Sequence, residues 1–196
     1  MGVAMNATTI PTHGSSSFIA LASVQMLMNK QINVQVEALT VERFAPYGEA
    51  ILVPSVPAPK TGDDWDCWFG LGVLRCTNPK VGIVITRPAS GRFDAMEREP
   101  IVEFLLPITG AVIQAVGLPG DLGDFRQVPE AHNVRAFLVE PGQAIVMAPG
   151  TWHCAAMPVE GKVLYYFATE EHPPEPGRGS SPWIKFANGD VVQVQK

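Results

Sequence analysis

The chain has 196 residues, of which 46% are hydrophobic and 17% are charged, and its formal net charge is −5. This composition excludes a disordered chain, which would be poor in apolar and rich in charged residues. The acidic balance and the lack of any basic run argue against a nucleic-acid partner, because phosphate binding needs clustered Lys and Arg. The 18 Gly and 18 Pro residues indicate many turns and favour short β-strands.

Residues 1–31 are predicted to form an N-terminal extension, with a short helix within residues 17–29. The most apolar part, residues 18–28, is too short to cross a bilayer and follows no basic segment, so neither a membrane partner nor a signal peptide is expected. Cys67, Cys76 and Cys154 show no C-x-x-C spacing. This favours a reducing compartment, and we expect a cytoplasmic protein.

Residues 32–196 are predicted to form a single all-β domain. A short helix is expected at residues 40–45, with Thr40 as its N-cap. The β-candidates are residues 34–39, 49–52, 65–74, 81–87, 101–106, 111–116, 134–139, 144–148 and 162–168. Many strands at short intervals, with no room for crossover helices, predict a barrel or a double-sheet sandwich.

A C-terminal hairpin is expected around Asn188-Gly189, between the alternating runs 183–187 and 190–194. Asn-Gly is the preferred two-residue hairpin turn, because both central positions need positive φ.

Two short motifs, Glu97-Arg98-Glu99-Pro100-Ile101-Val102-Glu103 with Gly110 and Gly142 to His153, have a spacing that resembles the metal-binding motifs of a cupin barrel. The first contains Glu97, Glu99 and Glu103, which have the same parity and would share one face of an extended strand. A buried carboxylate needs a metal, an opposite charge or a shared proton, because burying it unpaired costs several kcal/mol. The alternative is that Glu97 and Glu99 lie on a solvent-exposed edge.

The end of the second motif, Pro149-Gly150-Thr151-Trp152-His153, is a tight turn that is predicted to direct His153 into the barrel. The alternative is a structural histidine whose hydrogen bonds are satisfied. His13, His132 and His172 lie in Gly-, Pro- or polar-rich segments and are interpreted as loop residues.

Two lone cations lie in apolar runs. Arg87 or Arg135 could clamp a substrate carboxylate through two parallel hydrogen bonds, or pair with the glutamates, and the residues leave both open. Glu97 and Trp152 are also predicted to contact the substrate.

Six short pieces of the chain occur in the same order as in one known family: Phe44-Ala45-Pro46-Tyr47-Gly48-Glu49, Glu97-Arg98-x-Pro100, Leu106-Pro107-x-x-Gly110, Val134-Arg135-Ala136-Phe137, Gly142-Gln143-Ala144-Ile145 and Trp152-His153. Taken together they resemble the ureidoglycolate lyase family, formerly called ureidoglycolate hydrolases. The resemblance implies a cupin-like double-stranded β-helix (jelly-roll barrel). It also implies a homodimer that cleaves ureidoglycolate to glyoxylate and urea in allantoin degradation, a part of purine metabolism.

This chain departs from the family at three positions near the motifs. Glu99 stands where the family usually has His, Glu103 where it usually has Gln, and Cys154 where a second His is common. A divergent homologue acting on a related 2-hydroxy or 2-oxo acid is therefore an alternative. A divalent metal held by Glu97, Glu99, Glu103 and His153 would be a hard cation such as Mg or Mn. No organic cofactor is expected.

His153 with Glu103 or Glu99 is predicted to supply the acid and the base, because C–N cleavage needs one group that takes the hydroxyl proton and one that protonates the leaving nitrogen. A non-catalytic cupin-type module that binds or senses a small ligand is the alternative. A metal-dependent oxygenase or isomerase ranks last, because only His153 lies in a motif.

Overall fold

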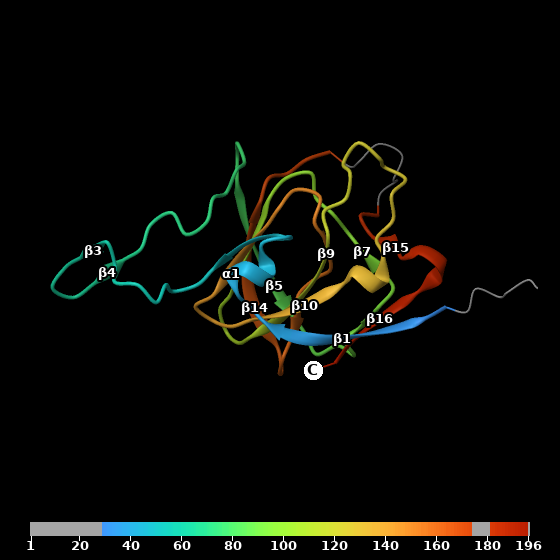
Figure 1. The fold of residues 1–196 in the computed structure, drawn as a ribbon, viewed down its shortest axis with the longest axis horizontal. Coiled ribbons are helices and arrows are strands. Elements are labelled where there is room, and N and C mark those ends of the chain that lie inside the picture. The colour runs from blue at the N-terminus through green and yellow to red at the C-terminus, as the bar shows by residue number, and fades with distance from the viewer. Residues whose placement is uncertain (1–28, 174–180, 196) are drawn as a thin grey trace, which may run out of the picture.

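A computed structural model describes residues 29–173 and 181–195, which form two main β-sheets (Figure 1). The first sheet contains, in spatial order, β12 (Trp152–His153), β9 (Val112–Gly117), β10 (Arg135–Val139), β1 (Gln31–Ala38), β16 (Val191–Gln195) and β6 (Arg92–Phe93), with β13 (Met157–Pro158) also paired to β9. The second contains β2 (Gly48–Ile51), β11 (Ala144–Met147), β8 (Glu103–Pro107), β14 (Val163–Thr169) and β5 (Lys80–Thr86). The predicted all-β, cupin-like barrel is confirmed.

Two further pairs are short. β15 (Ile184–Lys185) pairs with β7 (Ala95–Met96), and β3 (Lys60–Thr61) pairs with β4 (Asp66–Cys67). The β3–β4 segment projects away from the barrel (Figure 1).

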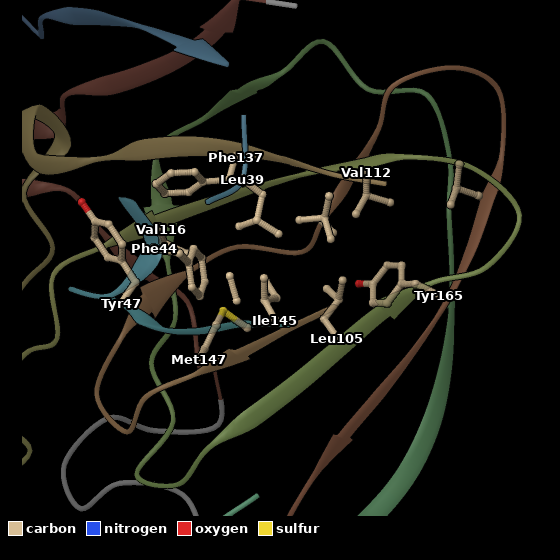
Figure 2. Close-up of a cluster of buried hydrophobic side chains, with 14 residues drawn as sticks. Leu39, Phe44, Tyr47, Leu105, Val112, Val116, Phe137, Ile145, Met147 and Tyr165 are labelled. Atoms are coloured by element: carbon tan, nitrogen blue, oxygen red, sulfur yellow. The ribbon is translucent and has the colours of Figure 1, made fainter. Parts of the chain in front are cut away.

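The main core lies between the two sheets, because both contribute buried side chains to one cluster (Figure 2). Phe137 of β10 in the first sheet and Ile145 of β11 in the second are each fully buried. Phe44 packs edge-on against Phe137, with ring centroids 5.4 Å apart. Burying one such side chain stabilises the fold by about 1.5–3 kcal/mol, so this cluster holds the sheets together.

The short helix α1 (Val41–Phe44) is confirmed, and it is capped as expected. The Thr40 hydroxyl accepts a hydrogen bond from the Arg43 backbone N–H at 3.1 Å, which satisfies one of the free donors at the helix start. The described residues also contain two 3-10 turns, Ala131–Asn133 and Ala187–Gly189. No helix in the described part of the chain is long and apolar enough to cross a membrane.

The helix predicted in the N-terminal extension falls on residues outside those described, and the division at residue 31 stays a prediction. The strand predicted at residues 65–74 was wrong over most of its length, since only Asp66–Cys67 is extended and paired. Phe69 is 91% exposed there. The end of the run meets β2 through side chains, since the Val73 N–H donates to the Glu49 carboxylate at 2.8 Å, and forms no backbone ladder with it.

The C-terminal hairpin was also wrong in its pairing, although its turn has the expected backbone. Asn188 and Gly189 both have positive φ, 61° and 70°. However, β15 pairs with β7, whereas β16 pairs with β6 and β1. The two strands therefore leave the turn toward different partners, because each finds its hydrogen bonds in the long-range sheet rather than in its neighbour.

Candidate active site

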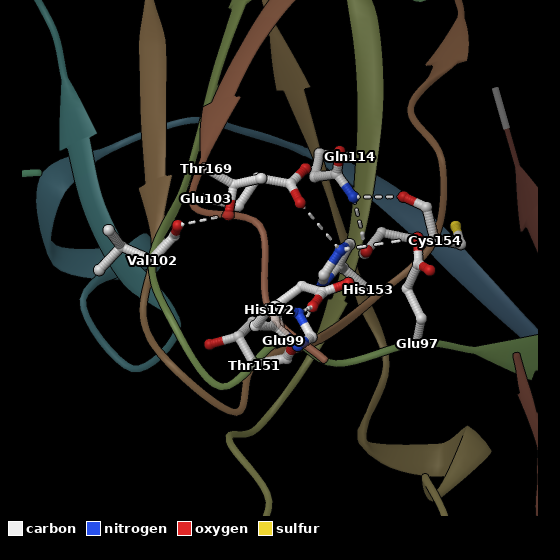
Figure 3. A network of polar contacts seen from close by, with 11 residues as sticks. Glu97, Glu99, Val102, Glu103, Gln114, Thr151, His153, Cys154, Thr169 and His172 are labelled. Atoms are coloured by element: carbon white, nitrogen blue, oxygen red, sulfur yellow. Dashed lines mark hydrogen bonds and ion pairs between the residues drawn. The ribbon is translucent and has the colours of Figure 1, made fainter. Parts of the chain in front are cut away.

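One cavity brings together the four residues on which the two motifs converge. Lining a space of about 300 Å³ are Glu97, Glu99, Glu103, His153 and Gln114, all labelled in Figure 3, together with Tyr165. The carboxylate side chains are only 19–20% exposed and the imidazole is 5% exposed. The alternative that Glu97 and Glu99 lie on a solvent-exposed edge is therefore excluded.

The acidic segment reaches the cavity in two pieces rather than as one strand. β7 ends at Met96, Glu97 forms a lone bridge with His153, and β8 starts at Glu103. Pro100 has no N–H to donate to a ladder, which accounts for the interruption between the two pieces. Arg98 points the other way and lies 4.8 Å from the centre of the Trp152 ring. The predicted parity of the carboxylates is thus preserved across the break.

The tight turn before His153 is held by close backbone contacts. The Gly150 N–H donates to the Glu99 carbonyl at 2.7 Å, and the Gly120 N–H donates to the Gly150 carbonyl at 2.8 Å. Gly150 has φ of +81°, and a Cβ there would lie 2.8 Å from the Gly120 carbonyl oxygen. Only glycine fits this position without strain, so the turn needs it to present His153.

His153 is tied to the acidic segment through its backbone and its side chain. Its N–H and carbonyl exchange hydrogen bonds with Glu97, both at 2.8 Å. Its Nδ1 lies 3.0 Å from the Thr151 carbonyl, which can only accept, so Nδ1 carries a proton. Its Nε2 then faces the carboxylates, 3.6 Å from Glu103 Oε2 and 3.9 Å from Glu97 Oε1. Both ring nitrogens therefore face acceptors, an arrangement that favours the imidazolium.

Two groups in the cavity, His153 and Glu97, have strongly shifted pKa values. Burial opposes the charge on the imidazole, but Glu103, the Thr151 carbonyl and Glu97 together raise the pKa of His153 to about 9. Burial also raises the pKa of Glu97 to about 7, a shift that His153 opposes and that Glu99 and Glu103 reinforce. Near neutral pH the cavity therefore holds a charged imidazole beside a carboxyl group that exchanges its proton readily.

A second imidazole, missed by the sequence reasoning, reaches this site from the segment after β14. His172 Nε2 contacts Glu99 Oε2, and its Nδ1 lies 2.9 Å from the Pro173 carbonyl (Figure 3). The resemblance implied a histidine at position 99, and the chain instead places an imidazole against Glu99 from a distant loop. The Pro-rich surroundings of His172 indicated a loop, and no local pattern signals that this loop returns to the cavity.

Three of the predicted substrate-binding residues are not in this cavity. Arg87 is exposed beyond the end of β5. Arg135 is engaged by Glu37, which both Nε and Nη2 of the guanidinium contact. Trp152 is buried against Arg98 on the other side of the chain. None of the three lines this cavity, so the predicted arginine clamp and the predicted Trp152 contact stay predictions without support from its lining.

The other reactive side chains on the wall are held neutral. Burial and the nearby Glu103 raise the pKa of Tyr165 to about 12. Burial and Glu97 raise the pKa of Cys154 to about 12. Neither a phenolate nor a thiolate forms near neutrality, so the glutamates and histidines remain as the acid–base groups.

The donor types of the tentative metal set suit a hard cation, but their arrangement does not fit one. In residues 29–173 and 181–195, no group of three or more His, Cys, Asp and Glu side chains is placed to hold a metal ion. Glu99 is engaged by His172, and His153 lies against Glu103. These pairs would have to separate before a metal could take the same atoms.

The fold and this site define a cupin-like all-β barrel with a partly open cavity lined by acid–base groups. A model of the ureidoglycolate lyase family matches residues 83–177, a segment that contains both motifs, and the resemblance to this family is confirmed. No curated protein matches the sequence.

Several solved structures are similar at low identity. One is a dTDP sugar isomerase from Desulfovibrio desulfuricans, with 12% identity over 70% of this chain and 96% of that one and a TM-score of 0.37. Another is RmlC from Streptococcus suis, with 13% identity over 60% of this chain and 61% of that one and a TM-score of 0.37. A formate complex of Lactobacillus farciminis oxalate decarboxylase is also similar (14%, TM-score 0.34), and the match covers 46% of this chain but only 23% of that one.

Proposed function

We propose that this chain is a carbon–nitrogen lyase that cleaves ureidoglycolate to glyoxylate and urea, or a divergent homologue acting on a related 2-hydroxy or 2-oxo acid. The observation that carries the proposal is the position of His153 Nε2, 3.6 Å from Glu103 and 3.9 Å from Glu97 inside one cavity. The family match over residues 83–177 supplies the reaction class.

Glu97 is the base in this mechanism. With a pKa of about 7 it is partly ionised at neutral pH, which suits a group that must take and later return a proton. It removes the hydroxyl proton of the substrate as the C–N bond breaks and the aldehyde forms. Sequence reasoning gave Glu97 only a binding role and favoured Glu103 or Glu99 for acid–base work.

His153 is the acid. Its imidazolium donates the Nε2 proton to the departing urea nitrogen, while Glu103 stabilises the charged ring before the transfer. After release of products, the proton taken up by Glu97 returns to Nε2, 3.9 Å away. No proton is gained or lost overall, which matches the balanced cleavage of ureidoglycolate to glyoxylate and urea.

The substrate carboxylate needs a positive partner, and no arginine or lysine lines the cavity in the described part of the chain. The His153 imidazolium attracts this carboxylate through its charge alone, because Nδ1 contacts the Thr151 carbonyl and the Nε2 proton goes to the leaving nitrogen. The same feature favours the second candidate, a module that binds a neutral or cationic ligand without turning it over.

Turnover by the purified protein separates these candidates. We expect release of glyoxylate from ureidoglycolate above the uncatalysed background, and a loss of about 10²–10⁴-fold in kcat for His153→Gln. His132→Gln is the matched control, because the His132 side chain is 69% exposed and pairs with Glu130 away from the cavity. Wild-type release equal to the background would reject the lyase in favour of a binding module.

A lyase of this kind would act in allantoin degradation in the cytoplasm, and we expect it to be a homodimer without a nucleic-acid or membrane partner. Trp65, just before β4, and Phe69, two residues after it, are 53% and 91% exposed and offer an apolar contact surface. Sedimentation of wild type and Phe69→Ser tests this: the variant should be monomeric at concentrations where the wild type is dimeric.

A further inference from the structure

The cavity holds more hydrogen-bond acceptors than donors, and this imbalance concerns Glu99 and Gln114 most. Glu99 uses Oε2 to bind His172. Among the described residues, no donor reaches Oε1 of the same carboxylate. The side chain is 20% exposed and lines the cavity, so this oxygen is open to a ligand.

Gln114 presents a second open acceptor from strand β9. Its side-chain N–H groups donate to the carbonyls of Cys154 and Ala115, at 2.7 and 3.1 Å. Because carbonyls only accept, these contacts require the NH₂ group on that side and the amide oxygen on the other. In the described part of the chain no donor reaches this oxygen. It is also absent from the fully buried side-chain atoms that have no hydrogen-bond partner, so it keeps some access to the cavity. The residue is 1% exposed and lines the cavity, and because its NH₂ group is bound to the two carbonyls, the amide oxygen is the polar atom that it can offer to a ligand.

We infer that Glu99 and Gln114 form the subsite for the ureido group of the substrate, –NH–CO–NH₂, and that His172 is the positioning residue for Glu99. The inference rests on the proposed function for the identity of the substrate. A ureido group carries N–H donors at both nitrogens, which match the two open acceptor oxygens. A buried acceptor left without a donor costs free energy, so the site disfavours ligands that lack these N–H groups.

The orientation of Glu99 depends on His172. Nδ1 of His172 faces the Pro173 carbonyl and Nε2 faces Glu99, so the ring is held at both nitrogens. The other charged groups of this segment are occupied elsewhere: Glu170 accepts from the Thr77 N–H at 2.8 Å, and Glu171 pairs with Lys80. Replacing His172 therefore frees the carboxylate of Glu99 to rotate, without removing the carboxylate itself.

Binding of two ligands that cannot be cleaved tests the subsite without turnover. N-carbamoylglycine keeps the ureido group and the carboxylate but lacks the hydroxyl, and N-acetylglycine lacks the terminal NH₂. We expect the wild type to bind N-carbamoylglycine about tenfold more tightly, as one charge-assisted hydrogen bond is worth roughly that factor. His172→Asn and Glu99→Gln should reduce this preference to near unity, whereas His132→Gln should keep it. Thermal melting checks that each variant is folded.

Kinetics give a second readout where turnover is present. Loss of His172 should raise KM for ureidoglycolate about tenfold and leave kcat within a few-fold, because the terminal NH₂ of the ureido group takes no part in the cleavage and binds alike in the ground and transition states. Equal binding of the two ligands by the wild type, or no binding of N-carbamoylglycine, would overturn the inference. A preference for N-carbamoylglycine without turnover of ureidoglycolate would support the subsite and reject the lyase. Turnover of ureidoglycolate without this preference would support the lyase and reject the subsite.

Discussion

The Nε2 atom of His153 lies 3.6 Å from Oε2 of Glu103, and this contact joins the two motifs inside the barrel. Without it, burial alone would favour the neutral ring, because a charge in an enclosed site loses its hydration. The carboxylate of Glu103 is thus the main reason that this enclosed imidazole is a cation.

We therefore predict that Glu103→Gln lowers the pKa of His153 well below the wild-type value of about 9. The amide keeps the shape of the side chain and removes its charge, so burial then dominates. NMR titration of the His153 ring protons measures the shift, and the alkaline limb of kcat should move in the same direction. An unchanged titration would show that Glu103 does not hold the charge.

Stability should fall as pH rises through the neutral range, for two separable reasons. Glu97 has a folded-state pKa of about 7 against an ordinary value of 4.5, so the folded state holds this proton more tightly than the unfolded chain does. The associated stability is present below about pH 4.5 and is lost as pH rises through 7. For His153 the loss runs from 6.5 through about 9.

Glu97→Gln isolates the first of these losses. Between pH 4.5 and 7.5, the free energy of unfolding of the wild type should fall by about 2–3 kcal/mol more than that of the variant, since each pKa unit corresponds to about 1.4 kcal/mol. Urea denaturation at fixed pH values measures both proteins. Parallel curves for the two proteins would contradict the raised pKa of Glu97.

Arg87→Ala and Arg135→Ala should leave KM for a carboxylate substrate unchanged within about twofold, because neither side chain lines the cavity. Arg135→Ala should still cost stability, since it leaves Glu37 without the guanidinium that lowers the pKa of that carboxyl group. This pair is partly exposed, so the loss should be about 1 kcal/mol or less. A tenfold rise in KM for either variant would show that the replaced arginine binds the substrate carboxylate.

Turnover should survive dialysis against EDTA, because the site glutamates and histidines contact one another and are not arranged as a ligand set. Glyoxylate release before dialysis, after it, and after addition of Mn²⁺ or Mg²⁺ checks this. Loss of activity that either ion restores would show that these pairs separate to bind a metal.

Much of the site could be predicted from local patterns. The common parity of Glu97, Glu99 and Glu103 survives the interruption at Pro100, since residues on either side of the break still face the same cavity. Gly150 occupies a backbone conformation that only glycine adopts without strain, and the motif places His153 directly after this turn. Asn188 and Gly189 likewise have the predicted positive φ, but their turn does not join paired strands.

The amino-acid sequence by itself determined which residue types face inward and where the chain turns, because these depend on side-chain alternation and on backbone sterics within a few residues. Only the tertiary structure decided which distant groups meet. Arg135 is turned to Glu37 by the pairing of β1 with β10, and His172 reaches Glu99 by the return of a loop. Such contacts arise from sheet register and closure of the barrel, which no local spacing encodes.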